Sequence, residues 1–461
     1  MRKEYPLTAA QNMHHQWIRE YNTQQVSGVS IVASLKVELD FGLLKKCIQM
    51  EMERYGCLRL RFTKPDEKGD VKQYLVKKDT RDIPLKDLTG MTLKEADDLM
   101  QQWAYQTLDG DNRPMCEVYM MKLPEGYNGF FIHMDHRLID SCGLVVMVSD
   151  LMALYTHYRF GTEFPADLAD FETVLANDLA KASNEKRFAK DKKFWDDQLD
   201  QLGEPLYSDI QGPSVLEASR KKHKKKNLRA ADIERKELFV AVKDYQLEPE
   251  PTKGLIDFCM NHQLSMTNLL LLGIRTYLSK VNGGQEDITI ENFISRRSTH
   301  DEWTSGGSRT IMFPCRTVIS GDTDFMSAAY EIQNVQNRIY MHSNYDPELI
   351  REEMRKRYKT PKDTTYESCY LTYQPLPVRP ENPYLQSLQM HNKWFANGAA
   401  TKKMYLTVSH LENGGMNFSY HYQTVSLEEH DMELLYYYMM RILFMGISNP
   451  ELTLNEIMAS V

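Results

Sequence analysis

Few of the signatures that mark secreted, metal-bound or nucleotide-dependent proteins occur in this sequence. Its seven cysteines are an odd number without a CxxC pair, so we expect neither a disulfide framework nor a cysteine-based zinc site. A reduced, cytoplasmic setting with mostly buried thiols is the simplest interpretation. The chain also lacks a GxxxxGKS/T motif, a GxSxG elbow and a GxGxxG after a strand. P-loop, α/β-hydrolase and dinucleotide-binding chemistry are therefore excluded.

Long hydrophobic runs are absent as well. The N-terminal residues MRKEYPLTAAQ turn polar at once, unlike a signal peptide. No apolar run approaches the roughly 20 residues that cross a bilayer, so we expect no membrane span. The formal net charge is −8, which gives the molecule no electrostatic footprint suited to nucleic acid.

The composition that is present is ordinary for a globular protein, with 42% hydrophobic and 26% charged residues. A chain of 461 residues is too long for one compact hydrophobic core, so its length favours two domains. Strand and helix patterns recur in a similar order in both halves, although no clear internal repeat is visible. We therefore expect an α/β fold with mixed sheets, built from two related modules.

The expected elements follow from periodicity and capping residues. Thr8 and Asp40 are N-cap candidates for two early helices. His14 and His15 lie on the first of these, where we expect surface or interface positions. The expected strands are 26–39, 114–123, 126–134, 237–242, 288–295, 309–319, 368–373, 385–395, 403–411 and 416–422, and the main helices are 41–54, 92–108, 170–182, 185–199, 253–262, 266–280, 323–342, 347–358 and 426–445.

Residues 203–235 break this pattern and contain the basic run SRKKHKKK at 219–226. Such a run is typical of a solvated, mobile loop within a linker. The alternative is a basic surface that binds an acidic ligand or partner, such as a phosphate-bearing cofactor or an acidic carrier domain.

The stretch FFIHMDHRLIDSCGLVVMVSD, residues 130–150, predicts a buried strand, a sharp polar turn and a buried helix. His136 lies in the turn, and Asp140 follows it by four residues. An imidazole at such a junction is suited to proton transfer near neutral pH. His133, Asp135, His136 and Asp140 could also form a metal cluster, but so many mixed ligands in one tight turn argue against it, and we expect no metal.

Several segments together resemble one family. DHRLIDS, residues 135–141, resembles the HHxxxDG motif of the superfamily of nonribosomal peptide synthetase condensation domains and CoA-dependent acyltransferases. YPLTAAQ at 5–11 resembles the opening condensation motif, and RYGCLRLRF at 54–62 resembles RHExLRTxF in spacing and ends. Residues 265–297 resemble the central helix, turn and strand of the family. The likeness covers nearly the whole chain in the family's order.

This resemblance implies two chloramphenicol-acetyltransferase-like halves in a V shape with a central tunnel. We place them at 1–175, with the HxxxD motif, and 176–461. It also implies an acyltransferase with no permanently bound cofactor. The donor would be a phosphopantetheine thioester, on an acyl or peptidyl carrier protein or on CoA, and the acceptor a small amine or alcohol. Because no adenylation or carrier segment is visible, we expect a free-standing member.

Transferred residue by residue, His136 is the second motif histidine, the expected general base or positioning residue for the attacking nitrogen or oxygen. Asp140 is the motif aspartate, chiefly structural and paired with a buried arginine in the family. A buried carboxylate needs a cation, and a guanidinium can pair with it through two bonds. Arg59 is the candidate partner; the alternative is an ordinary surface arginine on a strand.

Two motif positions depart from the family. Asp135 replaces the first histidine, and we hypothesise that its carboxylate raises the pKa of His136. Ser141 replaces the motif glycine and is expected to narrow the tunnel or to contact substrate. Arg316 stands near the family's asparagine on the acceptor side. These changes also fit a second hypothesis, a catalytically silent module that binds carrier proteins or other pathway enzymes.

Overall fold

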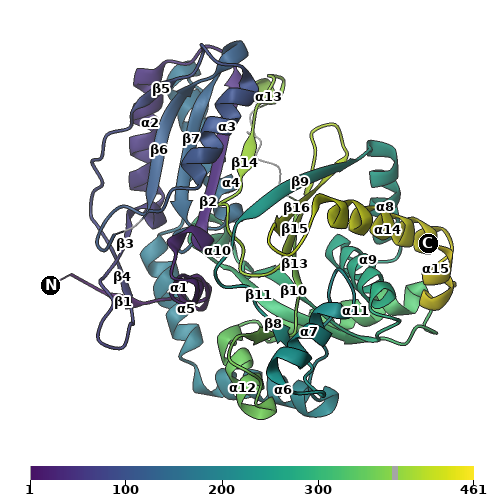
Figure 1. Ribbon diagram of the computed structural model, residues 1–461. Helices are drawn as coiled ribbons and strands as arrows, with labels where there is room; N and C mark the ends of the chain where they lie inside the picture. Colours follow the sequence, from purple (N-terminus) through teal and green to yellow (C-terminus); the bar gives the residue numbers. More distant parts are fainter. Residues whose placement is uncertain (1, 109, 376–382) are drawn as a thin grey trace. The chain divides into compact units, whose positions relative to one another are not determined.

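The computed structural model describes residues 2–108, 110–375 and 383–461 (Figure 1). The chain divides into two units. Unit 1 holds the chain up to Ser183, then Ser295–Ile311 and a later segment that ends at Ala399, and unit 2 holds the remainder. The sequence predicted two contiguous halves that meet at residues 175 and 176; in the structure, two later segments return to unit 1.

Unit 1 is built on a five-stranded sheet in the order β14-β2-β7-β6-β5. The β7 strand lies near its centre and pairs antiparallel with both β2 and β6, while β5 runs parallel to β6. A second sheet has the order β1-β4-β3. The strands are β1 (Tyr5–Pro6), β2 (Gly28–Lys36), β3 (Leu60–Phe62), β4 (Lys72–Leu75), β5 (Leu85–Asp87), β6 (Cys116–Lys122), β7 (Tyr127–Asp135) and β14 (Lys393–Phe395).

Both faces of the five-stranded sheet are covered, which explains why β7 reads as a continuous apolar run. Successive side chains of a strand point to opposite faces. Phe130, Ile132 and Met134 accordingly join one hydrophobic cluster, and Phe131 joins another. The helices of unit 1 are α1 (Ala9–Tyr21), α2 (Phe41–Arg54), α3 (Leu93–Ala104), α4 (Ser141–Phe160), α5 (Phe171–Ala182), α10 (His300–Thr304) and α13 (Pro383–Gln386), with short 3-10 turns at Gln24–Ser27, Gly56–Arg59 and Pro124–Gly126.

Unit 2 is built on a six-stranded mixed sheet in the order β11-β10-β13-β15-β16-β9. The β13 strand runs parallel to β10 and β15, whereas β16 runs antiparallel to β15 and β9. The strands are β8 (Ala231–Asp232), β9 (Val240–Leu247), β10 (Asp287–Ser295), β11 (Thr310–Val318), β12 (Thr364–Thr365), β13 (Cys369–Gln374), β15 (Met404–His410) and β16 (Met416–Gln423).

The helices of unit 2 include α9, which was predicted at residues 266–280. Residues 268–279 of α9 are all buried, as its LLLLGI core requires. In the described part of the chain, no helix is long and apolar enough to cross a bilayer. The helices are α6 (Glu185–Leu202), α7 (Ser214–His223), α8 (Pro249–Asn261), α9 (Met266–Val281), α11 (Phe325–Met341), α12 (Pro347–Tyr358), α14 (Glu429–Ser448) and α15 (Leu454–Ser460).

The prediction of a mobile loop at 203–235 was wrong, because much of this basic region is structured. It contains α7 and β8, and Leu216 of α7 packs with Tyr207 and Ala231 in a small hydrophobic cluster. The carboxylate of Asp232 accepts hydrogen bonds from Lys222 at 3.0 Å and His223 at 2.8 Å. A few apolar residues and one acidic partner therefore order a segment whose composition is typical of a loop.

Candidate active site

The candidate site is a strand–turn–helix in unit 1 that runs from β7 into α4. The amide of His136 donates to the carbonyl of Ser27 at 2.6 Å, and the amide of Leu138 donates to the carbonyl of Asp135 at 2.9 Å, which closes the turn. Asp140 is the N-cap of α4, and its Oδ1 accepts from the amide of Gly143 at 3.0 Å. The backbone therefore fixes both ends of the turn that carries His136.

Asp140 is the most heavily bonded carboxylate of the site. The Arg297 guanidinium donates to both of its oxygens, with Nη2 2.7 Å from Oδ1 and Nη1 2.8 Å from Oδ2. The backbone amides of Arg309 and Thr310 donate to Oδ2 at 2.8 and 2.9 Å, and the Thr310 hydroxyl does so at 2.9 Å. Asp140 thus binds the turn to the returning segment Ser295–Ile311.

The Asp140–Arg297 pair is buried, with side-chain exposures of 1% for Asp140 and 0% for Arg297. Burial alone would raise the pKa of the Asp140 carboxyl, but the charge and hydrogen bonds of Arg297 outweigh burial and hold that pKa well below its ordinary range. Asp140 is therefore a permanent anion that shapes the site and takes no part in proton transfer.

The predicted partner, Arg59, does not pair with Asp140. Its Nη1 donates to the carbonyls of Val76 and Lys77, at 3.0 and 3.3 Å. Arg59 is the last residue of a 3-10 turn, and its side chain binds the two residues that directly follow β4. The sequence did contain a signal for the true partner. Arg297 follows the predicted strand 288–295 by two residues and is the last residue of the segment 265–297 that resembles the family.

Asp135, which replaces the first motif histidine and was also a candidate for the wall of the substrate tunnel, is fully buried, with 0% exposure. Its carboxylate accepts from Arg137 Nε and Nη2 at 3.0 and 2.8 Å, from Gln24 at 3.0 Å and from the Ser27 hydroxyl at 3.2 Å. Burial would raise the pKa of Asp135, but Arg137 keeps it below the ordinary value. A fully bonded, buried carboxylate supports the turn and faces no open space.

His136 is the one residue from 129 to 140 that is not buried. Its pKa is lowered, mainly by desolvation, and the nearby carboxylates of Asp140 and Asp135 only partly oppose this effect. Asp135 thus acts on the pKa of His136 in the direction we hypothesised, but desolvation outweighs it and the net pKa is lowered. His136 is a neutral imidazole, and so a usable base, at neutral pH.

The His136 ring stacks on His14 of α1, with ring centroids 4.4 Å apart and an angle of 15° between the planes. His14 and His15 were expected at the surface, but they are only 3% and 6% exposed. Neither ring nitrogen of His14 has a hydrogen-bond partner among the described residues. Desolvation and then His136 lower the pKa of His14, so the stack consists of two neutral rings. No feature of the sequence indicated this pairing.

His133, the other histidine of the stretch, is a structural residue. Its Nδ1 lies 2.7 Å from the Ser30 hydroxyl, and its Nε2 lies 2.9 Å from the carbonyl of Gln106. Both ring nitrogens are thus engaged across the sheet, so His133 cannot act in the chemistry of His136.

The two remaining predicted residues occupy different units. Ser141 is the first residue of α4 and is half-buried. Arg316 lies on β11 in unit 2, where its guanidinium holds Asp287 at 2.7 and 2.8 Å and the carbonyls of Leu202, Gly203 and Glu204 at the end of α6. Its charge is therefore already compensated by Asp287.

Taken together, unit 1 presents the half-buried, neutral imidazole of His136 on a turn that the buried Asp140–Arg297 ion pair holds in place. This arrangement can accept a proton from an attacking hydroxyl or amine and can return it to a leaving group. The fold is a mixed α/β fold, and its candidate site contains one histidine on the turn between β7 and α4. The family model described as the condensation domain matches residues 1–460, so the chain belongs to the condensation-domain family.

Curated relatives are distant and much longer. The chain is 21% identical to surfactin synthase subunit 1 of Bacillus subtilis, in a match that covers 98% of this chain. It is 23% identical to tyrocidine synthase 3 of Brevibacillus parabrevis, in a match that covers 79% of this chain. The matched regions span only 12% and 5% of the lengths of these two relatives.

Solved structures confirm the fold. The first condensation domain of the calcium-dependent antibiotic synthetase, in complex with a substrate analogue, matches with a TM-score of 0.79 at 16% identity, covering 98% of this chain and 99% of that one. The starter condensation domain of rhizomide synthetase, in complex with C8-CoA, matches with a TM-score of 0.79 at 14% identity, covering 98% and 97%. The predicted family and the predicted mixed α/β fold class are therefore both confirmed.

Proposed function

We propose that this chain is an acyltransferase that moves an acyl group from a phosphopantetheine thioester, on a carrier protein or CoA, to an amine or alcohol. The observation that carries the proposal is the neutral, half-buried imidazole of His136, the one residue from 129 to 140 that is not fully buried, on a turn fixed by Asp140 and Arg297. Condensation domains catalyse acyl transfer from such thioesters, and a matching starter domain holds C8-CoA.

The reaction balances with the residues of the site. The acceptor nitrogen or oxygen attacks the thioester carbonyl carbon, and His136 accepts the proton that the acceptor loses. The carbon–sulfur bond then breaks, an amide or ester remains, and the thiolate leaves and takes up a proton. The chemical step needs proton transfer and stabilisation of a transient oxyanion.

The test is an intact-mass assay of the purified chain with acetyl-CoA, octanoyl-CoA and an aminoacyl-loaded carrier protein, each mixed with amine and alcohol acceptors. We expect a product heavier than the acceptor by the acyl group, absent from heat-inactivated samples. The bond formed then identifies the acceptor class.

A second candidate is the silent module that binds carrier proteins, favoured by Asp135 and Ser141 in place of the motif histidine and glycine. Binding of the loaded carrier protein without product from any donor would favour this candidate over the acyltransferase. Product formation would reject it.

The pH dependence of transfer should reflect the lowered pKa of His136. A general base must be neutral to act, and burial makes this imidazole harder to protonate than an ordinary histidine, whose pKa is 6.5. We expect kcat/KM to stay level as the pH falls from 8 past 6.5, and to decline only at lower pH. Tryptophan fluorescence at each pH checks that the protein is still folded, and a decline already centred above 6.5 contradicts this assignment.

His14 should act as a positioning residue for His136. His14→Ala removes the stacked ring, so we expect kcat to fall by about tenfold with a smaller change in KM, because the base loses its fixed orientation. His14→Phe keeps a flat ring at the same place and should recover most of kcat. Equal losses in both variants, with normal folding, would contradict a role for the stack.

A further inference from the structure

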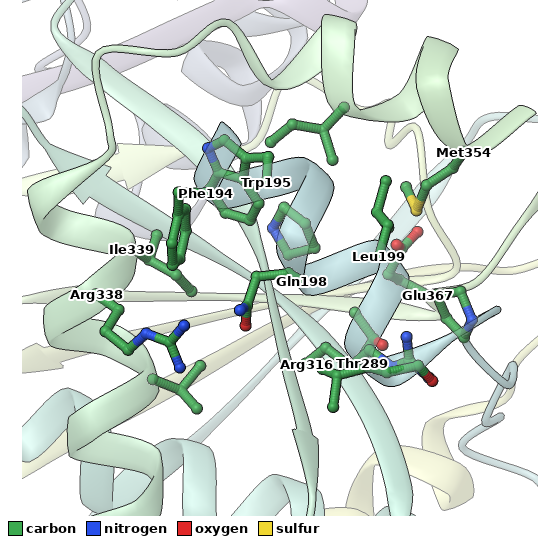
Figure 2. Close-up of a pocket in the computed structure, with 15 residues that line it drawn as sticks. Phe194, Trp195, Gln198, Leu199, Thr289, Arg316, Arg338, Ile339, Met354 and Glu367 are labelled. Atoms are coloured by element: carbon green, nitrogen blue, oxygen red, sulfur yellow. The ribbon is translucent and has the colours of Figure 1, made fainter. Parts of the chain in front are cut away.

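Unit 2 contains a pocket of its own, lined by α6, α11, α12 and strands of its sheet (Figure 2). The cavity itself has a volume of about 50 Å³, and the space that includes its open side is about 570 Å³. Its walls are mostly apolar, and Leu199, Ile350 and Met354 are buried side chains there. All of the lining residues belong to unit 2, so the pocket is defined without reference to His136.

Two buried polar atoms around this pocket have no hydrogen-bond partner among the described residues. They are the indole Nε1 of Trp195 and the hydroxyl Oγ1 of Thr289. The two residues are only 6% and 2% exposed. A buried polar group without a partner destabilises the folded state, so such atoms call for an explanation. Both can donate a hydrogen bond, which points to a ligand with an acceptor group.

The pocket also has an uncompensated cation. The Arg338 guanidinium lies over the Phe194 ring, 5.2 Å from its centroid, and among the described residues no carboxylate forms an ion pair with Arg338. Figure 2 shows the side chains of Arg338 and Gln198 pointing into the same side of the space. Arg316 lines the pocket too, but its charge is held by Asp287.

The one carboxylate that lines the pocket, Glu367, is already neutralised. Lys402 lies 3.1 Å from its Oε2, and the Thr365 hydroxyl donates to the same oxygen at 2.6 Å. In Figure 2 Glu367 lies on the side away from Arg338. A cationic ligand therefore finds no free anion here, whereas an anionic one finds a free guanidinium.

We propose that this pocket of unit 2 binds a small amphipathic carboxylate, an acid with a compact aromatic or short aliphatic body. The body would lie against Leu199, Ile350 and Met354, and the carboxylate would pair with Arg338. The site is separate from the acyl-transfer proposal, since binding needs no thioester and no contact with His136.

The experiment uses the full chain and 3-phenylpropanoate, with 3-phenylpropanol and 3-phenylpropylammonium as neutral and cationic analogues. Trp195 is the single tryptophan in unit 2 and reports binding by fluorescence, and titration calorimetry gives Kd independently. We expect the acid to bind about threefold to fivefold more tightly than the alcohol, because water screens an ion pair with an exposed guanidinium. The ammonium should bind most weakly.

Arg338→Gln should weaken binding of the acid by about threefold to fivefold and leave binding of the alcohol unchanged. Arg338 is exposed, so this change leaves the core intact. The matched control is Arg441→Gln, since Arg441 also lies over an aromatic ring of unit 2, 5.6 Å from the centroid of Tyr437, and does not line the pocket. It should leave binding unchanged.

Three results would overturn the proposal: equal binding of acid and alcohol, preferred binding of the ammonium, or acid binding that Arg338→Gln leaves intact. Absence of any binding by the folded chain would do the same. Each of these results leaves the transfer assay unaffected, so the two proposals can fail independently.

Discussion

Arg297→Met is expected to lower the free energy of unfolding of unit 1 by about 3–5 kcal/mol. Asp140 is buried, and Arg297 is the cation that binds both of its oxygens. Without the guanidinium, the carboxylate keeps only its backbone and hydroxyl donors and is left as an uncompensated buried charge. The loss should also loosen the returning segment Ser295–Ile311, because the same carboxylate holds Arg309 and Thr310.

The pH dependence of this effect has a definite sign. In the wild type, the pKa of Asp140 is held well below its ordinary value of 3.8. A carboxyl of this kind adds stability that is complete above its unfolded pKa and is lost as the pH falls toward the folded value. The difference in the free energy of unfolding between wild type and Arg297→Met should therefore have its largest value at pH 7 and should become smaller below about pH 4.

Urea unfolding followed by circular dichroism and tryptophan fluorescence measures the effect. Asp140→Asn added to Arg297→Met removes the stranded charge and should recover part of the lost stability. The matched control is Arg2→Met, which breaks a pair with Glu4 whose side chains are 45% and 32% exposed and should cost less than about 1 kcal/mol. If Arg297→Met lost no more stability than the Arg2→Met control, the proposed structural role of the Asp140–Arg297 pair would be contradicted.

The strand, turn and helix around His136 could be predicted because local pattern determines them. The apolar run of β7, the polar turn and the N-cap Asp140 each have a sequence signal that needs no distant contact. The resemblance to the family motif directed attention to His136, and from 129 to 140 it is the one residue that is not fully buried.

The partner of Asp140 and the stack on His136 could not be derived in the same way. Arg297 lies 157 positions after Asp140 in the chain, and only the return of Ser295–Ile311 to unit 1 brings them together. His14 was expected at a surface or interface position on a helix. Sequence periodicity shows which side of a helix is apolar, but it does not show that the His14 ring will stack on His136. The basic region 203–235 was misread because its three anchoring apolar side chains, Tyr207, Leu216 and Ala231, are widely separated.

His136→Ala is expected to lower the rate of acyl transfer by about 10²–10⁴-fold, the contribution of a positioned general base. The change removes the imidazole but leaves Asp140, Arg297 and the backbone bonds of the turn in place. Folding should therefore be close to that of the wild type. The measurement is initial rate per folded molecule, with product detected by intact mass and folding checked by thermal unfolding.

The matched control is His133→Gln, in the same stretch and only three positions away. His133 is bonded to Ser30 and to the carbonyl of Gln106, so its loss should lower stability while the rate per folded molecule stays near that of the wild type. The two histidines thus predict opposite outcomes: a rate effect without a folding effect at His136, and the reverse at His133. Acyl transfer that persists in His136→Ala would show that His136 is not the general base. His133 could not explain such activity, because both of its ring nitrogens are already bonded.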